Sequence, residues 1–228
     1  MRDADTNFPV YHEATSALDR ADIPYVVGGG LAVRAYGRTR YSKDMDIFLS
    51  LSRIGATMNV LTRAGFHTRD TDASWLYKAI KDDVLVDLIV RTTGDIRLEQ
   101  EAVRRGRWVQ LQDLPFYVMG PEDLLLRKVY SEAEGRPDWY DALSMMQKPI
   151  PGFDWPYFID LAQTHGPERV LSLLLFARSN PDVAAVPDWV IHRLMLGMLP
   201  GESRRQWPAR LHRLLPSPTD GIDGVRAA

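Results

Sequence analysis

Apolar residues along the first half of the chain change repeatedly between helical spacing and strand-like runs. Helical spacing is found in residues 10–21, 31–36, 53–64 and 96–105. Between and after these segments lie short apolar or alternating runs, which predict strands at residues 23–27, 40–49, 74–80, 84–90, 108–111 and 116–119. This order predicts that the first half has an α+β fold.

The second half of the chain is predicted to be helical. Gly120-Pro121-Glu122-Asp123 has the features of a helix start, because proline fits the first turn and acidic side chains favour the positive end of the helix dipole. From Asp138 onward only helical spacing remains, in residues 138–147, 154–164, 167–178 and 188–196. We therefore predict a sheet-containing part over residues 1–119, a helical part over residues 120–215 and a disordered tail over residues 216–228.

The composition limits the metals, compartments and partners of the chain. With no cysteine, disulfides and thiolate zinc sites are excluded, and the five histidines do not fall at metal-ligand spacing. A bound metal would therefore need oxygen ligands, which favours Mg²⁺ or Mn²⁺. The first residues lack the apolar core of a signal peptide, and no apolar run approaches the roughly 20 residues that span a bilayer. We expect a cytoplasmic protein without membrane association, and a net charge of −2 gives no general attraction for nucleic acid.

Three consecutive glycines, Gly28, Gly29 and Gly30, end the apolar run at residues 23–27. Without a Cβ, the backbone N–H groups at the start of the following helix can approach a phosphate closely, and the helix dipole favours its negative charge. The alternative is a tight strand-to-helix turn. A dinucleotide fingerprint is disfavoured because the third glycine of G-x-G-x-x-G is missing, and the chain has no P-loop sequence.

Asp44 and Asp46 stand one residue apart on the strand predicted at residues 40–49. Residues i and i+2 of a strand are about 6.6 Å apart at Cα and point the same way, so the two carboxylates can share divalent cations. The same face carries Arg40, which could neutralise a phosphate, whereas Lys43 points away. The alternative for the aspartate pair is a solvated sheet edge.

Asp87 is the single charged residue in the apolar run at residues 84–90. An unpaired carboxylate in such a strand would cost several kcal/mol, so Asp87 needs a partner. If its strand lies beside the strand of Asp44 and Asp46, three carboxylates meet, and Asp87 can accept a proton from an attacking hydroxyl. The alternative is a structural ion pair with a nearby arginine such as Arg91.

The order of these motifs resembles the nucleotidyltransferase superfamily related to DNA polymerase β. The resemblance rests on Gly28-Gly29-Gly30, the short helix after it, Ser42-Lys43-Asp44-Met45-Asp46 and the later Asp87. A second block is similar to the subfamily that includes abortive-infection and toxin–antitoxin nucleotidyltransferases. It consists of Pro121-Glu122-Asp123-Leu124-Leu125 with Lys128, followed by Arg136-Pro137-Asp138-Trp139-Tyr140-Asp141.

The resemblance implies a short mixed sheet flanked by helices, with a helical segment closing a cleft. It also implies roles for the motif residues. The glycines Gly28, Gly29 and Gly30 would bind the triphosphate, with Arg40 and Ser42 as further nucleotide contacts and Lys128 on the phosphate tail. The carboxylates of Asp44 and Asp46 would ligate two Mg²⁺ ions, or Mn²⁺, and Asp87 would complete the metal site and activate the acceptor hydroxyl.

Two positions depart from that pattern. Many relatives have Gly-Ser in the loop, where this chain has only glycine, so a hydroxyl contact to phosphate is lost. Relatives often have Arg-x-Lys-Asp where this chain has Arg136-Pro137-Asp138, so a cation is missing there. Both changes affect how the nucleotide would be held.

The sequence therefore predicts a Mg²⁺-dependent enzyme that moves a nucleoside monophosphate from an NTP to a hydroxyl of RNA, such as a tRNA end, or of a protein. The setting would be a toxin–antitoxin or phage-defence system, and the protein would act as a homodimer or with a cognate partner. Two alternatives remain: a non-catalytic nucleotide-binding or partner-binding module, and an antibiotic nucleotidyltransferase.

Overall fold

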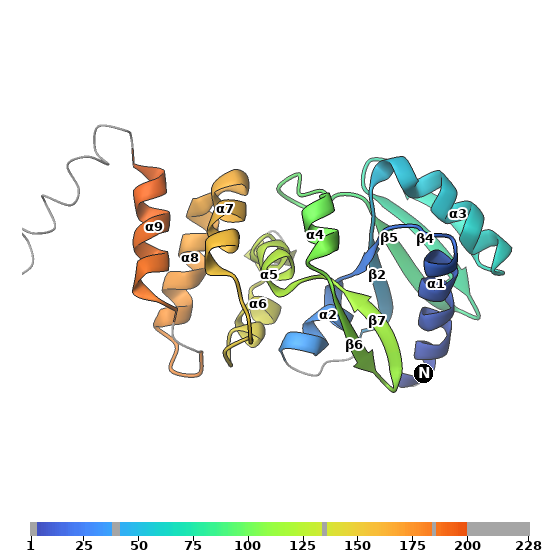
Figure 1. The fold of residues 1–228 in the computed structure, drawn as a ribbon, viewed down its shortest axis with the longest axis horizontal. Helices are drawn as coiled ribbons and strands as arrows, with labels where there is room; N and C mark the ends of the chain where they lie inside the picture. Colours follow the sequence, from blue (N-terminus) through green and yellow to red (C-terminus); the bar gives the residue numbers. More distant parts are fainter. Residues whose placement is uncertain (1–3, 38–41, 134–135, 184–185, 200–228) are drawn as a thin grey trace, which may run out of the picture.

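A computed structural model of the 228-residue chain describes residues 4–37, 42–133, 136–183 and 186–199 (Figure 1). The predicted fold class is confirmed: a mixed sheet with flanking helices is followed by a helical region. The sheet has seven strands in the order β3-β4-β5-β2-β1-β7-β6. Their bounds are β1 Val26–Val27, β2 Asp44–Phe48, β3 His67–Asp72, β4 Leu76–Lys81, β5 Val84–Ile89, β6 Arg107–Leu111 and β7 Leu114–Val118.

Six helical segments accompany the sheet. They are η1 Ala4–Asn7, α1 Phe8–Arg20, α2 Gly29–Tyr36, η2 Leu51–Arg53, α3 Ile54–Arg63 and α4 Gln100–Arg104. Helices α1 and α3 pack against each other beside the sheet (Figure 1). Helix α2 connects β1 to β2 and packs on β2. The sheet is mixed because β2 pairs with β5, and β1 with β7, in parallel, while the other neighbours are antiparallel.

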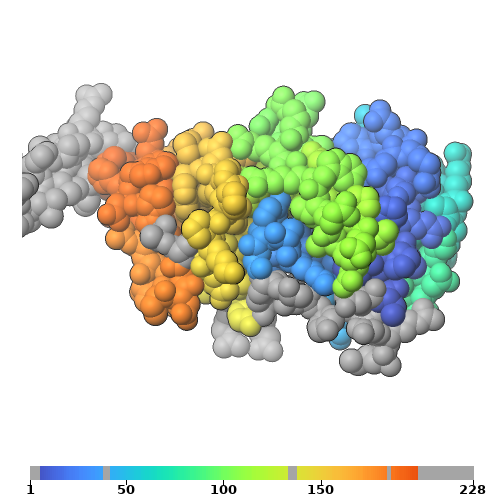
Figure 2. All heavy atoms as spheres, turned by 60° about the horizontal axis from the view of Figure 1, so that its bottom comes forward, coloured from blue at the N-terminus to red at the C-terminus, as the bar shows by residue number. Residues whose placement is uncertain are grey.

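Beyond the sheet the chain forms α5 Pro121–Val129, the short strands β8 Glu132–Ala133 and β9 Arg136–Pro137, and the helices α6 Tyr140–Met145, α7 Trp155–His165, α8 Pro167–Arg178 and α9 Asp188–Met198. Figure 1 shows α5 and α6 between the sheet and α7–α9. In the space-filling view the helical region (yellow to orange) adjoins the part that contains α2 in light blue (Figure 2). Helix α5 begins at Pro121, and the division of the chain into parts at residues 1–119 and 120–215 stays a prediction.

Helix α5 joins the two parts. It packs on α2, α6, α7 and α8, and every residue from Pro121 to Arg127 is buried. A single hydrophobic cluster runs from Phe8 in α1 to Leu194 in α9. Residues on α5 therefore face both the sheet and the helical region.

Strand β3 is not predicted by the sequence pattern, and neither are the two-residue strands β8 and β9. The residues of β3, His67-Thr68-Arg69-Asp70-Thr71-Asp72, are all polar, and five of the six are exposed. This strand is an edge strand that pairs only with β4, so burial imposes no alternation of apolar and polar residues on it.

Two predicted strands are shorter than expected. In residues 23–27 only Val26 and Val27 form strand β1, because the Ile23 N–H bonds to Leu18 O at the end of α1 and Pro24 has no N–H to donate. The strand predicted at residues 40–49 begins at Asp44, and residues 38–41 lie outside the described part.

Some predicted helices are also shorter; in the helix predicted at residues 138–147 only Tyr140–Met145 is helical. Helix α4 begins at Gln100, four residues later than expected, because an isolated bridge between Thr92 and Ile96 holds the preceding segment in a turn. The helical spacing of Leu125, Leu126, Val129 and Ala133 predicts a helix that reaches Ala133. Helix α5 ends at Val129, and Ala133 belongs to β8. The tail predicted at residues 216–228 lies outside the described residues. No helix that the structure describes is long and apolar enough to cross a membrane.

Candidate active site

Asp46 and Asp87 are direct neighbours across two parallel strands. In the β2–β5 ladder Asp46 is opposite Asp87, and Asp44 is opposite Leu85. Side chains alternate along a strand, and register partners share a face, so Asp44, Asp46 and Asp87 lie on one face of the sheet. The fold thus brings together two segments that are some forty residues apart in the sequence.

The Asp46 carboxylate lies against the start of α2. A Cβ on Gly29 would meet Asp46 Oδ2 at 1.6 Å, and Gly29 has a φ of +55°, where L side chains are disfavoured. A Cβ on Gly28 would meet the Phe48 ring at 2.2 Å, and the Gly28 N–H donates to Asp46 O at 2.8 Å. Packing of the helix start against β2 therefore requires the first two glycines.

The helix begins earlier than the sequence pattern predicts. Gly28 is the N-cap, and its carbonyl accepts the first intrahelical hydrogen bond from Ala32 N–H at 3.1 Å, so Gly29 and Gly30 form the first turn of α2. The first N–H groups of a helix have no intrahelical partner and carry the positive end of its dipole. The glycines thus form a tight strand-to-helix turn, and the same turn presents backbone N–H groups that can bind an anion.

Asp87 has an ion-pair partner on the other neighbouring strand. Lys78 is opposite Asp87 in the β4–β5 ladder, and its Nζ lies 3.1 Å from Asp87 Oδ1. The ammonium is therefore the counter-charge of this buried oxygen. Burial raises the pKa of the Asp87 carboxyl, and Lys78 partly opposes that rise.

The alternative prediction, that Asp87 pairs with Arg91, is wrong. Arg91 pairs with Asp95, with Nη1 3.4 Å from Oδ1, at the end of β5. The sequence does contain information that identifies Lys78 as the partner of Asp87. The two-residue turn Asp82-Asp83 has positive φ at both residues and fixes the register of the β4–β5 hairpin. Counting back from that turn places Lys78 opposite Asp87.

The residues before Asp46 are only partly described. The Ser42 hydroxyl donates to Asp44 Oδ1 at 3.3 Å, so Ser42 orients a candidate ligand rather than lining the cavity beside Asp46. Lys43 is exposed, as predicted. Arg40, a predicted phosphate contact, lies outside the described residues.

The carboxylates on this face fit the implied metal in part. Asp44 and Asp46 supply carboxylate oxygens on one face, which suit Mg²⁺ or Mn²⁺. The Asp87 carboxylate already neighbours the Lys78 ammonium. Among the residues that the structure describes, no three acidic or histidine side chains are grouped so that they could hold a metal ion. The aspartate pair fits a hard cation, and a site made by all three carboxylates stays a prediction.

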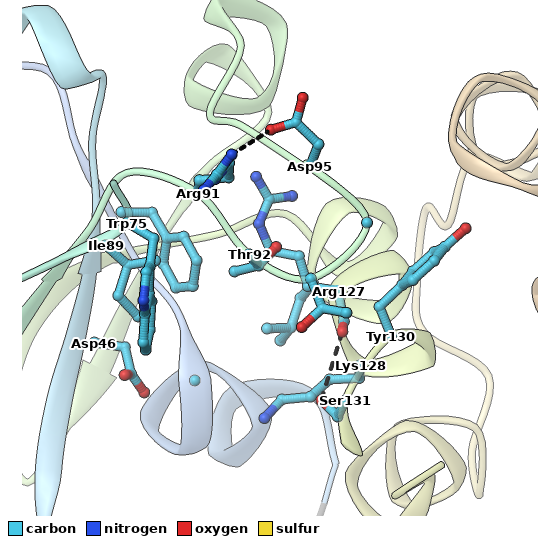
Figure 3. Close-up of a pocket in the computed structure, with 15 residues that line it drawn as sticks. Asp46, Trp75, Ile89, Arg91, Thr92, Asp95, Arg127, Lys128, Tyr130 and Ser131 are labelled. Atoms are coloured by element: carbon cyan, nitrogen blue, oxygen red, sulfur yellow. Dashed lines mark hydrogen bonds and ion pairs between the residues drawn. The ribbon is translucent and has the colours of Figure 1, made fainter. Parts of the chain in front are cut away.

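A cavity of about 530 Å³ opens beside Asp46. In Figure 3, Asp46, Trp75 and Ile89 form the sheet side of the cavity, and Arg127, Lys128, Tyr130 and Ser131 from the region of α5 form the other side. Gly29 lines the cavity as well. The candidate carboxylate and the helix start therefore face a space of the size that small-molecule sites have.

Lys128 lines this cavity from α5, on the wall opposite Asp46 (Figure 3). Its Nζ lies 2.8 Å from Oδ2 of Asp141 on α6, and both side chains are largely buried. Asp141 thus fixes the position of the ammonium and balances its charge. Lys128, from the second sequence block, therefore lines the same cavity as Gly29 and Asp46.

The sequence pattern does not single out Arg127, which also lines the cavity. Its side chain is only 4% exposed; Nη2 donates to Arg97 O at 2.8 Å, Nη1 lies 4.0 Å from Asp123 Oδ1, and Nε is unpaired. Burial lowers the pKa of Arg127 and raises the pKa of Asp123, which also accepts a hydrogen bond from Tyr157. Every position from Pro121 to Arg127 is buried, so the burial of these two charges leaves no periodic signal in the sequence.

The match to a known family covers the elements that build this cavity. Residues 7–151 match the model of a family described as nucleotidyl transferase of unknown function (DUF2204). The chain belongs to this family of nucleotidyl transferases. The matched residues run from α1 through α6 and include every carboxylate and cation discussed above, while α7–α9 lie beyond the match. No curated protein matches the sequence.

Solved structures of nucleotidyltransferases show distant similarity to this family member. An inferred nucleotidyltransferase from Thermotoga maritima has 15% identity and a TM-score of 0.41, covering 52% of this chain and 80% of its own. The antibiotic-resistance factor ANT(2'')-Ia has 17% identity and a TM-score of 0.40, covering 93% and 96%. The lincosamide antibiotic adenylyltransferase LnuA has 14% identity and a TM-score of 0.41, covering 57% and 90%. At these scores the similarities carry no argument about substrate.

Proposed function

We propose that this nucleotidyl transferase moves a nucleoside monophosphate from an NTP to a hydroxyl of an RNA or protein acceptor and releases pyrophosphate. One observation carries the proposal. Asp46 is in register with Asp87 and simultaneously contacts the start of α2 at Gly29. A candidate metal ligand and helix N–H donors thus meet at one cavity. The candidate base, Asp87, is the neighbour of Asp46 on the sheet and is not among the residues that line the cavity.

The proposed roles follow from the positions of the side chains. Asp44 and Asp46 would hold Mg²⁺, or Mn²⁺, with Asp87 completing a two-ion site; the metal would supply charge stabilisation at the transferring phosphate. The backbone N–H groups of Gly29 and Gly30 and the ammonium of Lys128 would bind the polyphosphate. Asp87 would accept the proton of the attacking hydroxyl, while Lys78 orients its carboxylate.

The charge of the cavity does not select the acceptor. Its charged lining consists of Arg91, Arg127 and Lys128 against Asp46 and Asp95. The three cations pair with Asp95, Asp123 and Asp141. We therefore keep RNA or protein as the acceptor, in a toxin–antitoxin or phage-defence system, on the resemblance of the second sequence block alone, with an antibiotic as the alternative.

The test incubates the protein with Mg²⁺ and each NTP labelled at the α-phosphate, together with total RNA, total protein or a panel of hydroxylated antibiotics. The proposal expects label in the RNA or protein fraction and loss of labelling in Asp46→Asn. Labelling of the antibiotics alone would reassign the acceptor. No labelling by the wild type in any fraction would contradict turnover.

A second candidate function is a binding protein that retains the fold without turnover. The ion pair between Lys78 and Asp87 favours it, because it reduces the capacity of that carboxylate to bind a metal. Binding and turnover separate cleanly in a melting experiment. Mg-NTP at 100 times its dissociation constant would stabilise either protein by about 2.7 kcal/mol, but only the enzyme would release pyrophosphate.

A further inference from the structure

Trp75 presents a large indole surface to the cavity. Its side chain is 40% exposed and lies at the sheet side of the cavity, close to Asp46 and Ile89 (Figure 3). The other aromatic residues of the lining, Phe48 and Tyr130, are 6% and 7% exposed. Within the described lining, Trp75 is therefore the aromatic ring that a ligand can cover.

The indole is held in place before any ligand binds. Trp75 Nε1 donates to Asp72 Oδ2 at 3.0 Å, and the Trp75 N–H donates to Asp72 O at 2.9 Å. The same carboxylate accepts from Ser74 N–H at 2.9 Å and from the Ser74 hydroxyl at 2.6 Å. The Val90 N–H donates to Trp75 O at 3.0 Å, which ties the turn to the end of β5. A ligand would lose little entropy of ordering on this surface.

The cavity combines candidate phosphate-binding groups with an apolar surface. Gly29, Asp46 and Lys128 are the groups to which the proposed function assigns the polyphosphate and its metal. Trp75 and Ile89 line the same cavity. A nucleotide whose phosphates contact Gly29 and Lys128 has its ribose and base left for the apolar surface of Trp75 and Ile89.

We propose, on the basis of the proposed function, that Trp75 is the stacking platform for the base of the donor NTP. Its only polar atom, Nε1, is engaged by Asp72, so the indole offers its π face and no hydrogen bond to the base. Stacking on an aromatic face tolerates every base. Trp75 thus selects nucleotides over bare polyphosphate and contributes little to the choice among the four NTPs.

The experiment compares two ligands by isothermal titration calorimetry in the presence of Mg²⁺: ATP and inorganic tripolyphosphate. Stacking is worth about 1–3 kcal/mol per base, so Trp75→Leu should weaken ATP binding about 5- to 150-fold. Its affinity for tripolyphosphate should stay within about twofold of the wild type. Trp75→Phe, which keeps a stacking face, should recover most of the ATP affinity.

The matched control is Trp108→Leu. Trp108 is 61% exposed on β6, its ring centroid is 5.2 Å from that of Tyr117 with the planes tilted by 48°, and it does not line the cavity. This control should leave the affinity for both ligands unchanged. Thermal melting of each variant in the absence of ligand verifies that the fold is retained.

Three outcomes would overturn the inference. Equal weakening of ATP and tripolyphosphate by Trp75→Leu would mean that Trp75 only supports the turn. Unchanged ATP affinity, with both ligands bound by the wild type, would remove the stacking role and leave the proposed function intact. Absence of binding of either ligand to the wild type would remove both proposals.

Discussion

Lys78 Nζ lies 3.1 Å from Asp87 Oδ1, and the two residues are register partners in the β4–β5 ladder. Their side chains are only 18% and 14% exposed. In the β3–β4 ladder the register partner of Lys78 is Arg69, which is also a cation. The counter-charge of Lys78 is therefore supplied by Asp87 on β5 and not by β3. The candidate base of the active site is therefore part of an ion pair built into the sheet.

Replacement of Lys78 by methionine should destabilise the protein by about 2 kcal/mol at neutral pH, because Asp87 loses its counter-charge. Burial raises the pKa of Asp87 in the folded protein, so the ionised carboxylate lowers the free energy of unfolding at pH values above this raised pKa. The effect vanishes when the pH falls below the pKa of Asp87 in the unfolded chain. The deficit should therefore shrink towards acidic pH. Urea unfolding at several pH values measures it.

The control for this variant is Lys81→Met on the same strand. Lys81 pairs with Glu13, whose side chain is 42% exposed, and this more solvated pair should be worth about 1 kcal/mol or less. A deficit for Lys78→Met that is no larger than the control, or that grows at acidic pH, would disagree with a buried pair.

Gly29→Ala should abolish nucleotide transfer. The new Cβ would collide with Asp46 Oδ2 at a position with φ of +55°, so either the carboxylate or the start of α2 must move. Gly55→Ala is the matched control, since nothing lies within 4 Å of its added Cβ in α3 and alanine favours helices by roughly 1 kcal/mol. Activity and melting temperature together test this pair. Full activity in Gly29→Ala would show that the contact with Asp46 is dispensable.

Asp123→Leu should destabilise the fold by about 3–5 kcal/mol, because Arg127 would remain buried without its counter-charge. The double variant with Arg127→Met should recover most of that loss, since neither charge then remains. Chemical denaturation of the two single variants and the double variant gives the coupling. Additive losses would mean that the 4.0 Å pair does not couple the two residues.

Lys128→Met should weaken the binding of Mg-tripolyphosphate about tenfold or more, because the cation facing Asp46 across the cavity is lost. Asp141→Asn keeps the ammonium and should affect binding less, although it removes the 2.8 Å ion pair with Lys128. Calorimetric titration compares the two. If Asp141→Asn were the more damaging variant, the pair would be structural, with no direct role for Lys128 in phosphate binding.

The sequence predicts the parts of the site that follow from burial and periodicity. Asp87 stands out because it is a charge in an apolar strand, and Asp44 and Asp46 because alternation puts them on one face. Their adjacency follows from the β2–β5 pairing, which connects distant segments. The strand β3 is not predictable in the same way, because an exposed edge strand lacks a hydrophobic pattern.

Other features depend on the packing of α5 between the two parts. The burial of Arg127 and Asp123 arises because α5 is enclosed by α2, α6, α7 and α8, and spacing within α5 does not encode those neighbours. The start of α2 at Gly29 is set by contact with Asp46 on β2. In both cases tertiary contact decides what local propensity leaves open.

The most direct test of the central claim is Mg²⁺-dependent transfer of α-phosphate label from NTP to total RNA or total protein by four proteins: wild type, Asp46→Asn, Asp87→Asn and Asp95→Asn. Asp95 borders the same cavity and pairs with Arg91, so it controls for the loss of a carboxylate there. The account predicts transfer by the wild type and by Asp95→Asn, with at least a hundredfold loss, about 2.7 kcal/mol, in the other two. Transfer that survives in Asp46→Asn and Asp87→Asn would contradict it.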